Sequence, residues 1–475
     1  MNANLDPRQL LLAAVAILVP LTLLLARRER ALLAWVCVTL GIQLLDTSII
    51  TNLPAARIVG LLLIPRAVSM LRIVRRIPIG RVIIVQFVYL VMLGIIFGFL
   101  IPWPSGGIDR AFNQIAPGRA TIYLIRSVAD ISLTLFVARQ LISGRHPANV
   151  LEYVLIGTTV AALSGLLEYF TAIDWYGRIT GLVQLNLPYR MRGFMFEPRA
   201  LGLIAVQGLM ICLVLYSGRR KFRLLATAGI HAAALFLSGS TSAIAVLLVA
   251  ILTVFASDAR YRAAIIAPVV VALIVIGTFI TIQPQYLDTY VGNVLLRLTL
   301  DRIEEEGRPE SAIGDLAARM DVLDGPPVLF LVANPTYIVT GTGPGLMSLP
   351  AAKYIPDASF YNELRERGVN SPPSSGILLE VSNAGLIGLG MWFVFVFGSI
   401  RAFTVLAFQA DSHGQEWLTM KSAFLAVSAS YLVQASASPI WPVFMGLGLG
   451  AAHLAREQQR RTQIKVSGKT KRFFK

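Results

Sequence analysis

Apolar residues run through this chain in long stretches, and short segments between them carry most of the charges. Stretches of roughly the 17 to 25 residues needed to cross a bilayer recur along most of its length. We place them at 10–26, 31–50, 55–71, 82–101, 119–141, 150–171, 194–217, 223–238, 241–256, 263–282, 374–400, 420–435 and 439–455. The pattern predicts an all-α integral membrane protein, a polytopic bundle of about thirteen transmembrane helices.

One long hydrophilic segment divides this pattern. Residues 1–282 hold predicted transmembrane helices 1–10, and residues 283–373 form the hydrophilic loop. Residues 374–455 hold helices 11–13, and residues 456–475 form a basic tail. Apolar positions within the loop recur at helical spacing, which predicts a helix over about 309–323. Basic residues follow the first apolar stretch instead of preceding it, so we expect a retained span and not a cleaved signal peptide.

Basic residues gather on one side of the predicted bundle. The chain has 42 Lys and Arg against 26 Asp and Glu, a formal net charge of +16. The clusters that fall on the same side lie at 27–30, 72–81, 139–145, 219–223, 260–262 and 456–475. Because short cytoplasmic loops are enriched in Lys and Arg, we expect this side to be cytoplasmic and the 283–373 loop to be extracytoplasmic. The basic tail is expected to lie on anionic membrane lipids and not on nucleic acid.

Composition supports the membrane interpretation and narrows the chemistry. Hydrophobic residues make up 56% of the chain and charged residues 14%, which excludes an ordinary soluble domain. The two cysteines lie in different apolar stretches, so we expect them to pack as small hydrophobic side chains. The four histidines show no metal-ligand spacing, and the sequence predicts neither a metal nor a cofactor.

The stretch RMRGFMFEPRALG, residues 190–202, is the most unusual in the chain. It places these ionisable side chains just before a long apolar stretch: Arg190, Arg192, Glu197 and Arg199. Arginine is costly at the bilayer centre, so such a cluster belongs at a membrane face or in a water-filled cavity. A tight turn at Gly193 and a helix start near Glu197 are expected there. Interfacial snorkelling or salt bridges to loop acids is the alternative to a binding role.

Polar residues inside other predicted spans are further candidates. Arg126 and Asp130 are four residues apart, which predicts an ion pair on one helix face. Arg126 is also a candidate substrate-binding residue, with a purely structural pair as the alternative. Glu380 lies in the outer half of the eleventh predicted helix, where a carboxylate must face a partner or water. The glycine-rich GTGPG at 341–345 predicts a turn.

Three short motifs carry a resemblance to a known family. They are RMRGFMFEP before a span, AARMDVL followed by GTGPG, and ILLEVSNAGLIGLG in a closing span. In this order they resemble the bacterial O-antigen ligases and the O-antigen or exopolysaccharide polymerases, over about residues 190–400. The resemblance implies a fold of the lipid-carrier-dependent glycosyltransferase class. It also implies the bacterial inner membrane as location, with the active site facing the periplasm.

By this resemblance, glycans carried on polyprenyl pyrophosphate are both donor and acceptor, and a chain-length regulator is a further partner. Such a donor is already activated, so catalysis needs oriented reactants and cations that stabilise the departing pyrophosphate. Arg192 and Arg319 match the arginine positions of the family and are expected to bind the pyrophosphate, with Arg190 and Arg199 in support. Glu197 and Glu380 are the candidates for the base that activates the acceptor hydroxyl.

One departure from the family separates its two activities. The ligases resemble one another in a histidine just before the closing span, and the matching position here is Ser374, a candidate substrate-binding residue. The 283–373 loop contains no histidine. We therefore expect a polymerase, with a ligase that transfers glycan to lipid A core or protein as the first alternative. A transporter or flippase is the second alternative, and it predicts internal repeats and interrupted helices near the midplane.

Overall fold

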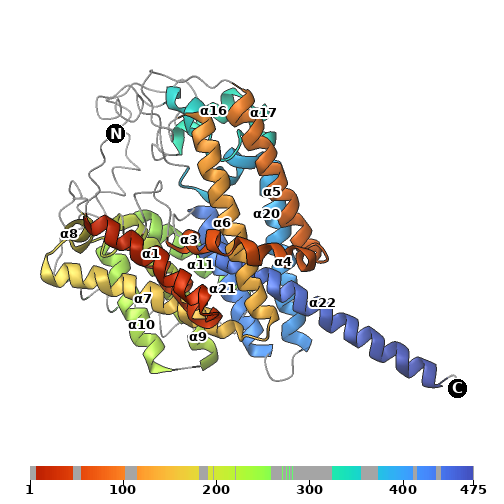
Figure 1. Cartoon of the computed structure of the whole chain (residues 1–475). Coiled ribbons are helices and arrows are strands. Elements are labelled where there is room, and N and C mark those ends of the chain that lie inside the picture. Colours follow the sequence, from red (N-terminus) through yellow and green to blue (C-terminus); the bar gives the residue numbers. More distant parts are fainter. Residues whose placement is uncertain are drawn as a thin grey trace.

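The computed structural model describes residues 7–45, 55–101, 115–180, 191–195, 197–219, 221–257, 324–354, 373–409, 414–434 and 440–473, with residues 270, 274, 278 and 281. All regular secondary structure in these ranges is helical (Figure 1). Five helices are long and apolar enough to cross a membrane, and three shorter helices are also apolar. The chain is thus a helical membrane protein. The count of about thirteen spans stays a prediction.

The first half of the chain forms α1 (Pro7–Leu25), α2 (Glu29–Thr39), η1 (Gln43–Leu45), α3 (Ala55–Leu62), α4 (Ile64–Val74), α5 (Pro78–Ile95), the π-helical turn η2 (Ile96–Leu100), α6 (Ala116–Ile142), α7 (Pro147–Thr171) and α8 (Trp175–Thr180). The continuous helix predicted over 55–71 is wrong, because the chain divides there into α3 and α4. Pro65 lies in the first turn of α4, where its missing N–H is tolerated.

The second half forms α9 (Pro198–Arg219), α10 (Phe222–Leu237), α11 (Thr241–Ser257), α16 (Gly325–Ala333), α17 (Thr336–Thr340), α18 (Ser348–Ala351), η4 (Ala352–Tyr354), α20 (Gly376–Gln409), α21 (Gly414–Val433) and α22 (Ile440–Phe473). The expected helix start near Glu197 is confirmed by α9. The loop helix expected over 309–323 lies outside the described residues.

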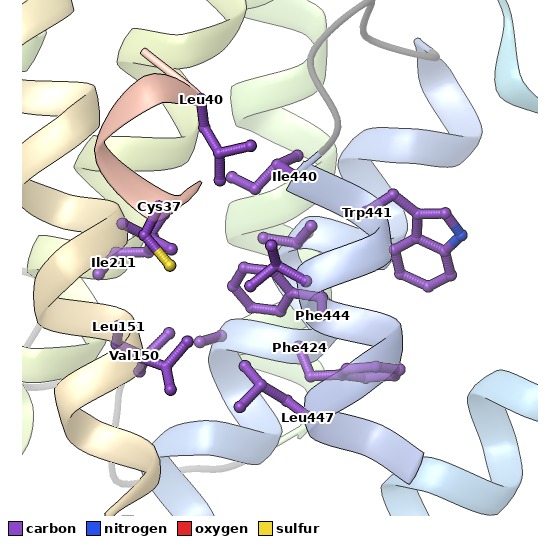
Figure 2. Close-up of a cluster of buried hydrophobic side chains, with 14 of the residues drawn as sticks. Cys37, Leu40, Val150, Leu151, Ile211, Phe424, Ile440, Trp441, Phe444 and Leu447 are labelled. Atoms are coloured by element: carbon purple, nitrogen blue, oxygen red, sulfur yellow. The ribbon is translucent and has the colours of Figure 1, made fainter. Parts of the chain in front are cut away.

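Apolar side chains hold the helices together. In Figure 2, Phe424 of α21 and Phe444 of α22 lie on one side of the cluster, and Cys37 of α2 and Val150 of α7 lie on the other. Both cysteines are free and fully buried, which confirms that they pack as hydrophobic side chains. In a membrane this packing is stabilised mainly by van der Waals contact. Trp441 belongs to the same cluster, and the centroid of its ring lies 5.8 Å from that of Phe424 (Figure 2).

Two backbone features position the polar groups of the bundle. Helix α3 packs closely on α6, because a Cβ at Gly60 would collide with the carbonyl oxygen of Ala129. Helix α20 is broken at Gly385, where φ is 65° and ψ is −167°. This conformation is essentially restricted to glycine. Helix α5 packs along α20, and α17 packs on α20 near the end of the bundle that also carries α16 (Figure 1).

Candidate functional site

Arg192 lies in the turn before α9, and its side chain is 3% exposed. Its guanidinium forms a two-pronged ion pair with Asp174: Nε donates to Oδ1 at 2.9 Å, and Nη2 donates to Oδ2. The same guanidinium lies over the ring of Tyr176, 4.8 Å from the ring centroid. Arg192 therefore ties its turn to α8.

The backbone of this turn is tied to α7. The carboxylate of Glu168 accepts the backbone N–H of Arg192 at 2.9 Å and that of Gly193. Gly193 has the expected tight-turn geometry, with φ at 57°. The residues Glu168, Asp174, Tyr176 and Arg192 are called the Arg192 latch below. The sequence pointed to Arg192 and Gly193 and offered a salt bridge to a loop acid as the alternative for Arg192, but it did not identify Asp174 or Glu168.

A second group of polar residues lies between α3, α6, α20 and α21. The hydroxyl of Tyr431 donates to the Glu380 carboxylate at 2.7 Å, which supplies the partner that the sequence required for Glu380. Arg57 donates to both carboxylate oxygens of Asp130, at 2.8 and 2.9 Å. Both members of this pair lie within electrostatic range of Tyr431. The residues Arg57, Asp130, Glu380 and Tyr431 are called the Tyr431 cluster below.

Aromatic packing fixes Tyr431. Its ring stacks on Trp441, with centroids 5.2 Å apart, and on Trp392 at 6.0 Å. The Tyr431 hydroxyl is thereby held at one place, so the Glu380 carboxylate that it binds is oriented as well.

The helical spacing on α6 identified the wrong partner for Asp130. The sequence predicted Arg126, four residues earlier on the same face, but the ion pair is made by Arg57 of α3. The guanidinium of Arg126 instead lies over the ring of Tyr123, 5.1 Å from its centroid. An aromatic ring one turn away thus takes the place that the spacing assigned to the acid.

Arginines line the same side of α6. Arg119, Tyr123, Arg126 and Asp130 follow one another at helical spacing, and Arg57 reaches this side from α3. Arg57, Arg119 and Arg126 all lie within electrostatic range of the Tyr123 hydroxyl. The residues Arg57, Arg119, Tyr123 and Arg126 are called the arginine face below. Only Arg126 among them was singled out from the sequence.

The glycine-rich segment 341–345 packs between α6 and the break in α20. Thr342 donates both its N–H, at 2.8 Å, and its hydroxyl, at 2.9 Å, to the carbonyl oxygen of Ser382. The N–H of Gly345 donates to the side chain of Asn383 at 3.0 Å. A Cβ at Gly345 would collide with the Tyr123 ring. The turn predicted here is confirmed, and it joins the arginine face to α20.

The remaining predicted residues fall in several places. Arg199 donates to the side-chain oxygen of Gln434 in the amide orientation that also lets Gln434 bind Ser242. Glu197 is exposed, and its carbonyl oxygen accepts the first backbone bonds of α9. The hydroxyl and the N–H of Ser374 both donate to the buried Asp324. Arg190 and Arg319 lie outside the described residues.

The structure therefore divides the predicted residues into separate groups. Arg126 and Glu380 belong to adjoining parts of one polar region, which contains the arginine face and the Tyr431 cluster. The Arg192 latch is built on α8, which lies apart from α16 and α17 in Figure 1. The binding roles predicted for Arg192, Arg199 and Glu197 stay predictions. In the described part of the chain, no group of three or more His, Cys, Asp or Glu could hold a metal ion.

Comparison with known proteins assigns this chain to no family. No family model matches this chain, and no curated protein matches it significantly.

Proposed function

We propose that this protein is a membrane glycosyltransferase that polymerises oligosaccharide repeat units carried on polyprenyl pyrophosphate. The observation that carries the proposal is the Tyr431 cluster, in which carboxylate, guanidinium and phenol groups from α3, α6, α20 and α21 meet within an apolar bundle. Ionisable side chains are costly in membrane-spanning segments and are kept there mainly for function. The resemblance of the motifs in 190–400 to the polymerases supports glycan as the substrate.

The groups present fit the chemistry of this transfer. A hydroxyl of the acceptor glycan attacks the anomeric carbon of the donor, and a new carbon–oxygen bond forms. The bond from that carbon to the pyrophosphate oxygen breaks, and its electron pair leaves with the polyprenyl pyrophosphate. Glu380 takes the hydroxyl proton, and Tyr431 orients its carboxylate. Arginine side chains of the same region stabilise the charge on the leaving group.

The surroundings of Ser374 favour a polymerase over a ligase. Ser374 lies where the resembling ligases have a histidine, and its hydroxyl donates to Asp324. The N–H groups of Ser374 and Ser375 also donate to this carboxylate, at 2.6 and 3.2 Å. These bonds anchor the start of α20, so the position serves the helix end and supplies no base. A ligase remains the first alternative.

One observation favours the second alternative, a transporter or flippase. Helix α20 is interrupted at Gly385, nine residues after its first residue Gly376. Interrupted membrane helices are common at the substrate sites of transporters. A glycan polymerase also needs to admit a lipid-linked substrate, so the break is compatible with both functions.

The deciding experiment uses the purified full-length protein in lipid nanodiscs with lipid-linked repeat units as the only glycan. A ladder of longer lipid-linked glycans is the expected result. Product that forms only after lipid A core is added would make the protein a ligase. Absence of product under both conditions, together with movement of lipid-linked glycan across vesicles that contain the protein, would make it a flippase.

A further inference from the structure

We infer that the arginine face is a subsite for a lipid-linked pyrophosphate, and that Arg119 and Arg126 bind its phosphate oxygens, with Arg57 held beside them by its ion pair with Asp130. This inference rests on the proposed function, since it assigns the place where the leaving group of the glycan donor is held. It also differs from the expectation drawn from the sequence, which assigned that group to the turn before α9.

Three arginine side chains come together on one side of α6. Two of the arginines lie on one side of α6, seven residues or about 10 Å apart along the helix axis. Arg57 is brought to the same side by the close approach of α3 at Gly60. All three guanidinium groups lie within electrostatic range of one phenol, that of Tyr123. Guanidinium groups gathered in this way create a positive potential that attracts an anion.

The guanidinium groups of the arginine face match a diphosphate in charge and shape. Arg119 and Arg126 place two guanidinium groups along one side of α6. A pyrophosphate that links a lipid to a sugar carries one negative charge on each phosphate. Guanidinium groups bind phosphate oxygens through two parallel N–H bonds, which lysine cannot do. The arginine face therefore suits a diphosphate better than a carboxylate or a single phosphate.

The arginine face lies next to the Tyr431 cluster, which holds the proposed base. Arg119 lies in the first turn of α6, which begins at Ala116, and its side chain is buried. Arg126 lies deeper along the helix, and Asp130 one turn beyond it leads to the Tyr431 cluster. A pyrophosphate group on this face would have the Glu380 carboxylate on its deeper side. The leaving group and the base would then occupy adjoining places.

The Arg192 latch explains why Arg192 is not assigned this role. Two of its guanidinium nitrogens are directed at Asp174. A phosphate could bind there only if this ion pair were broken. Arg192 therefore stabilises the turn before α9 and does not hold the leaving group.

The arginine face also has a structural role, and the test must separate this role from the binding of phosphate. Arg119 donates to the hydroxyl of Ser348, and Tyr123 packs against Gly345, so these side chains anchor the glycine-rich segment. A variant that lost this anchor could weaken binding indirectly. Arg126→Lys addresses this point, because it keeps the charge and most of the side chain but removes the planar fork.

The test measures equilibrium binding of geranylgeranyl pyrophosphate to the full-length protein in nanodiscs of neutral lipid. Inorganic pyrophosphate and nanodiscs that contain phosphatidylglycerol serve as competitors, which separates a lipid pyrophosphate from a free anion and from an ordinary lipid phosphate. Arg119→Gln and Arg126→Gln are each expected to weaken binding by about tenfold or more. Arg126→Lys is expected to fall between wild type and Arg126→Gln.

Two control variants complete the design. Arg66→Gln removes a partly buried arginine that pairs with Glu29 on another part of the bundle, and binding is expected to stay at the wild-type level. Arg192→Gln is likewise expected to leave the affinity unchanged. Thermal unfolding of each variant shows whether a loss of binding follows from a loss of the fold.

Unchanged affinity in Arg119→Gln and Arg126→Gln would overturn the inference, as would loss of binding in Arg192→Gln from a protein that remains folded. Equal competition by phosphatidylglycerol would assign the face to ordinary lipids and also overturn it. A glycan ladder formed by variants that bind like wild type would refute this subsite alone. Arginine-dependent binding without any ladder would refute the polymerase and leave the subsite standing.

Discussion

Arg57 and Asp130 form a two-pronged ion pair between α3 and α6, with N–O distances of 2.8 and 2.9 Å. Their side chains are 19% and 25% exposed, so both charges are largely removed from solvent. Removing one partner leaves the other charge poorly solvated, which costs more than the pair itself contributes. The pair therefore joins the arginine face to the Tyr431 cluster in both structure and energy.

A double-mutant cycle on this pair tests its energetic role. Arg57→Ala and Asp130→Ala are each expected to destabilise the protein, and the double variant is expected to lose less than the sum of the two. We expect a coupling free energy of about 1–3 kcal/mol, below that of a fully buried pair because of the partial exposure. Reversible unfolding in mixed micelles measures it. Strict additivity would mean that the two side chains do not interact.

Glu380→Gln tests the proposed base. Glutamine still accepts a hydrogen bond from the Tyr431 hydroxyl, so we expect the fold to persist, but an amide cannot take a proton. General bases contribute about 100-fold or more to rate, and glycan polymerisation should fall by that amount. The assay is the rate of ladder formation from lipid-linked repeat units. Glu457→Gln, on a side chain 53% exposed on α22, is the control that should retain wild-type activity.

Tyr431→Phe separates orientation of the carboxylate from proton transfer. This variant keeps the ring stacked on Trp441 and removes only the hydroxyl that binds Glu380. We expect a smaller loss of polymerisation than in Glu380→Gln, because the carboxylate remains but is less well oriented. A loss as large as that of Glu380→Gln would show that Tyr431 itself takes part in the chemistry.

Arg192→Lys tests the latch. Lysine cannot make the two-pronged pair with Asp174 and stacks less well on Tyr176. We expect a loss of stability of about 2 kcal/mol, measured by thermal unfolding, with unchanged affinity for a prenyl pyrophosphate. The matched control is Arg178→Lys on the exposed face of the same helix α8, which should leave stability unchanged. A stable Arg192→Lys protein with impaired binding would return Arg192 to the role expected from the sequence.

Local features of this chain could be predicted from its sequence, because they depend on neighbours along one helix or turn. The stretch 119–141 corresponds to α6, and the turn at Gly193 and the helix after Glu197 were also expected. Hydrophobic length and glycine chemistry determine such features. For Glu380 the sequence required a partner or water, but it did not identify Tyr431.

Contacts between residues that are distant along the chain could not be predicted from the sequence. Helical spacing offered Arg126 to Asp130, whereas the true partner, Arg57, is 73 residues away in sequence and is brought near by helix packing. The same holds for Arg192, whose partner Asp174 lies 18 residues earlier, just before α8. Only the packing of the helices brings these partners together.

The break in α20 gave no signal in the sequence. Glycine is frequent in membrane helices, and NAGLIG reads as a continuous span. In the structure, a Cβ at Gly385 would collide with the carbonyl oxygen of Val339, and the backbone conformation is one that other residues avoid. Gly385→Ala is therefore expected to cost about 1–3 kcal/mol of stability.

The position of the break allows this cost to be distinguished from a general effect of alanine in α20. Gly390, five residues later, has open space around it, so Gly390→Ala should be neutral or stabilise the helix by up to about 1 kcal/mol. Because the glycine-rich segment binds Ser382 and Asn383 beside the break, Gly385→Ala should also displace that segment from Tyr123. Weaker binding of prenyl pyrophosphate in Gly385→Ala, but not in Gly390→Ala, would show that the break in α20 supports the arginine face. Equal behaviour of the two variants would show that the break has no part in binding.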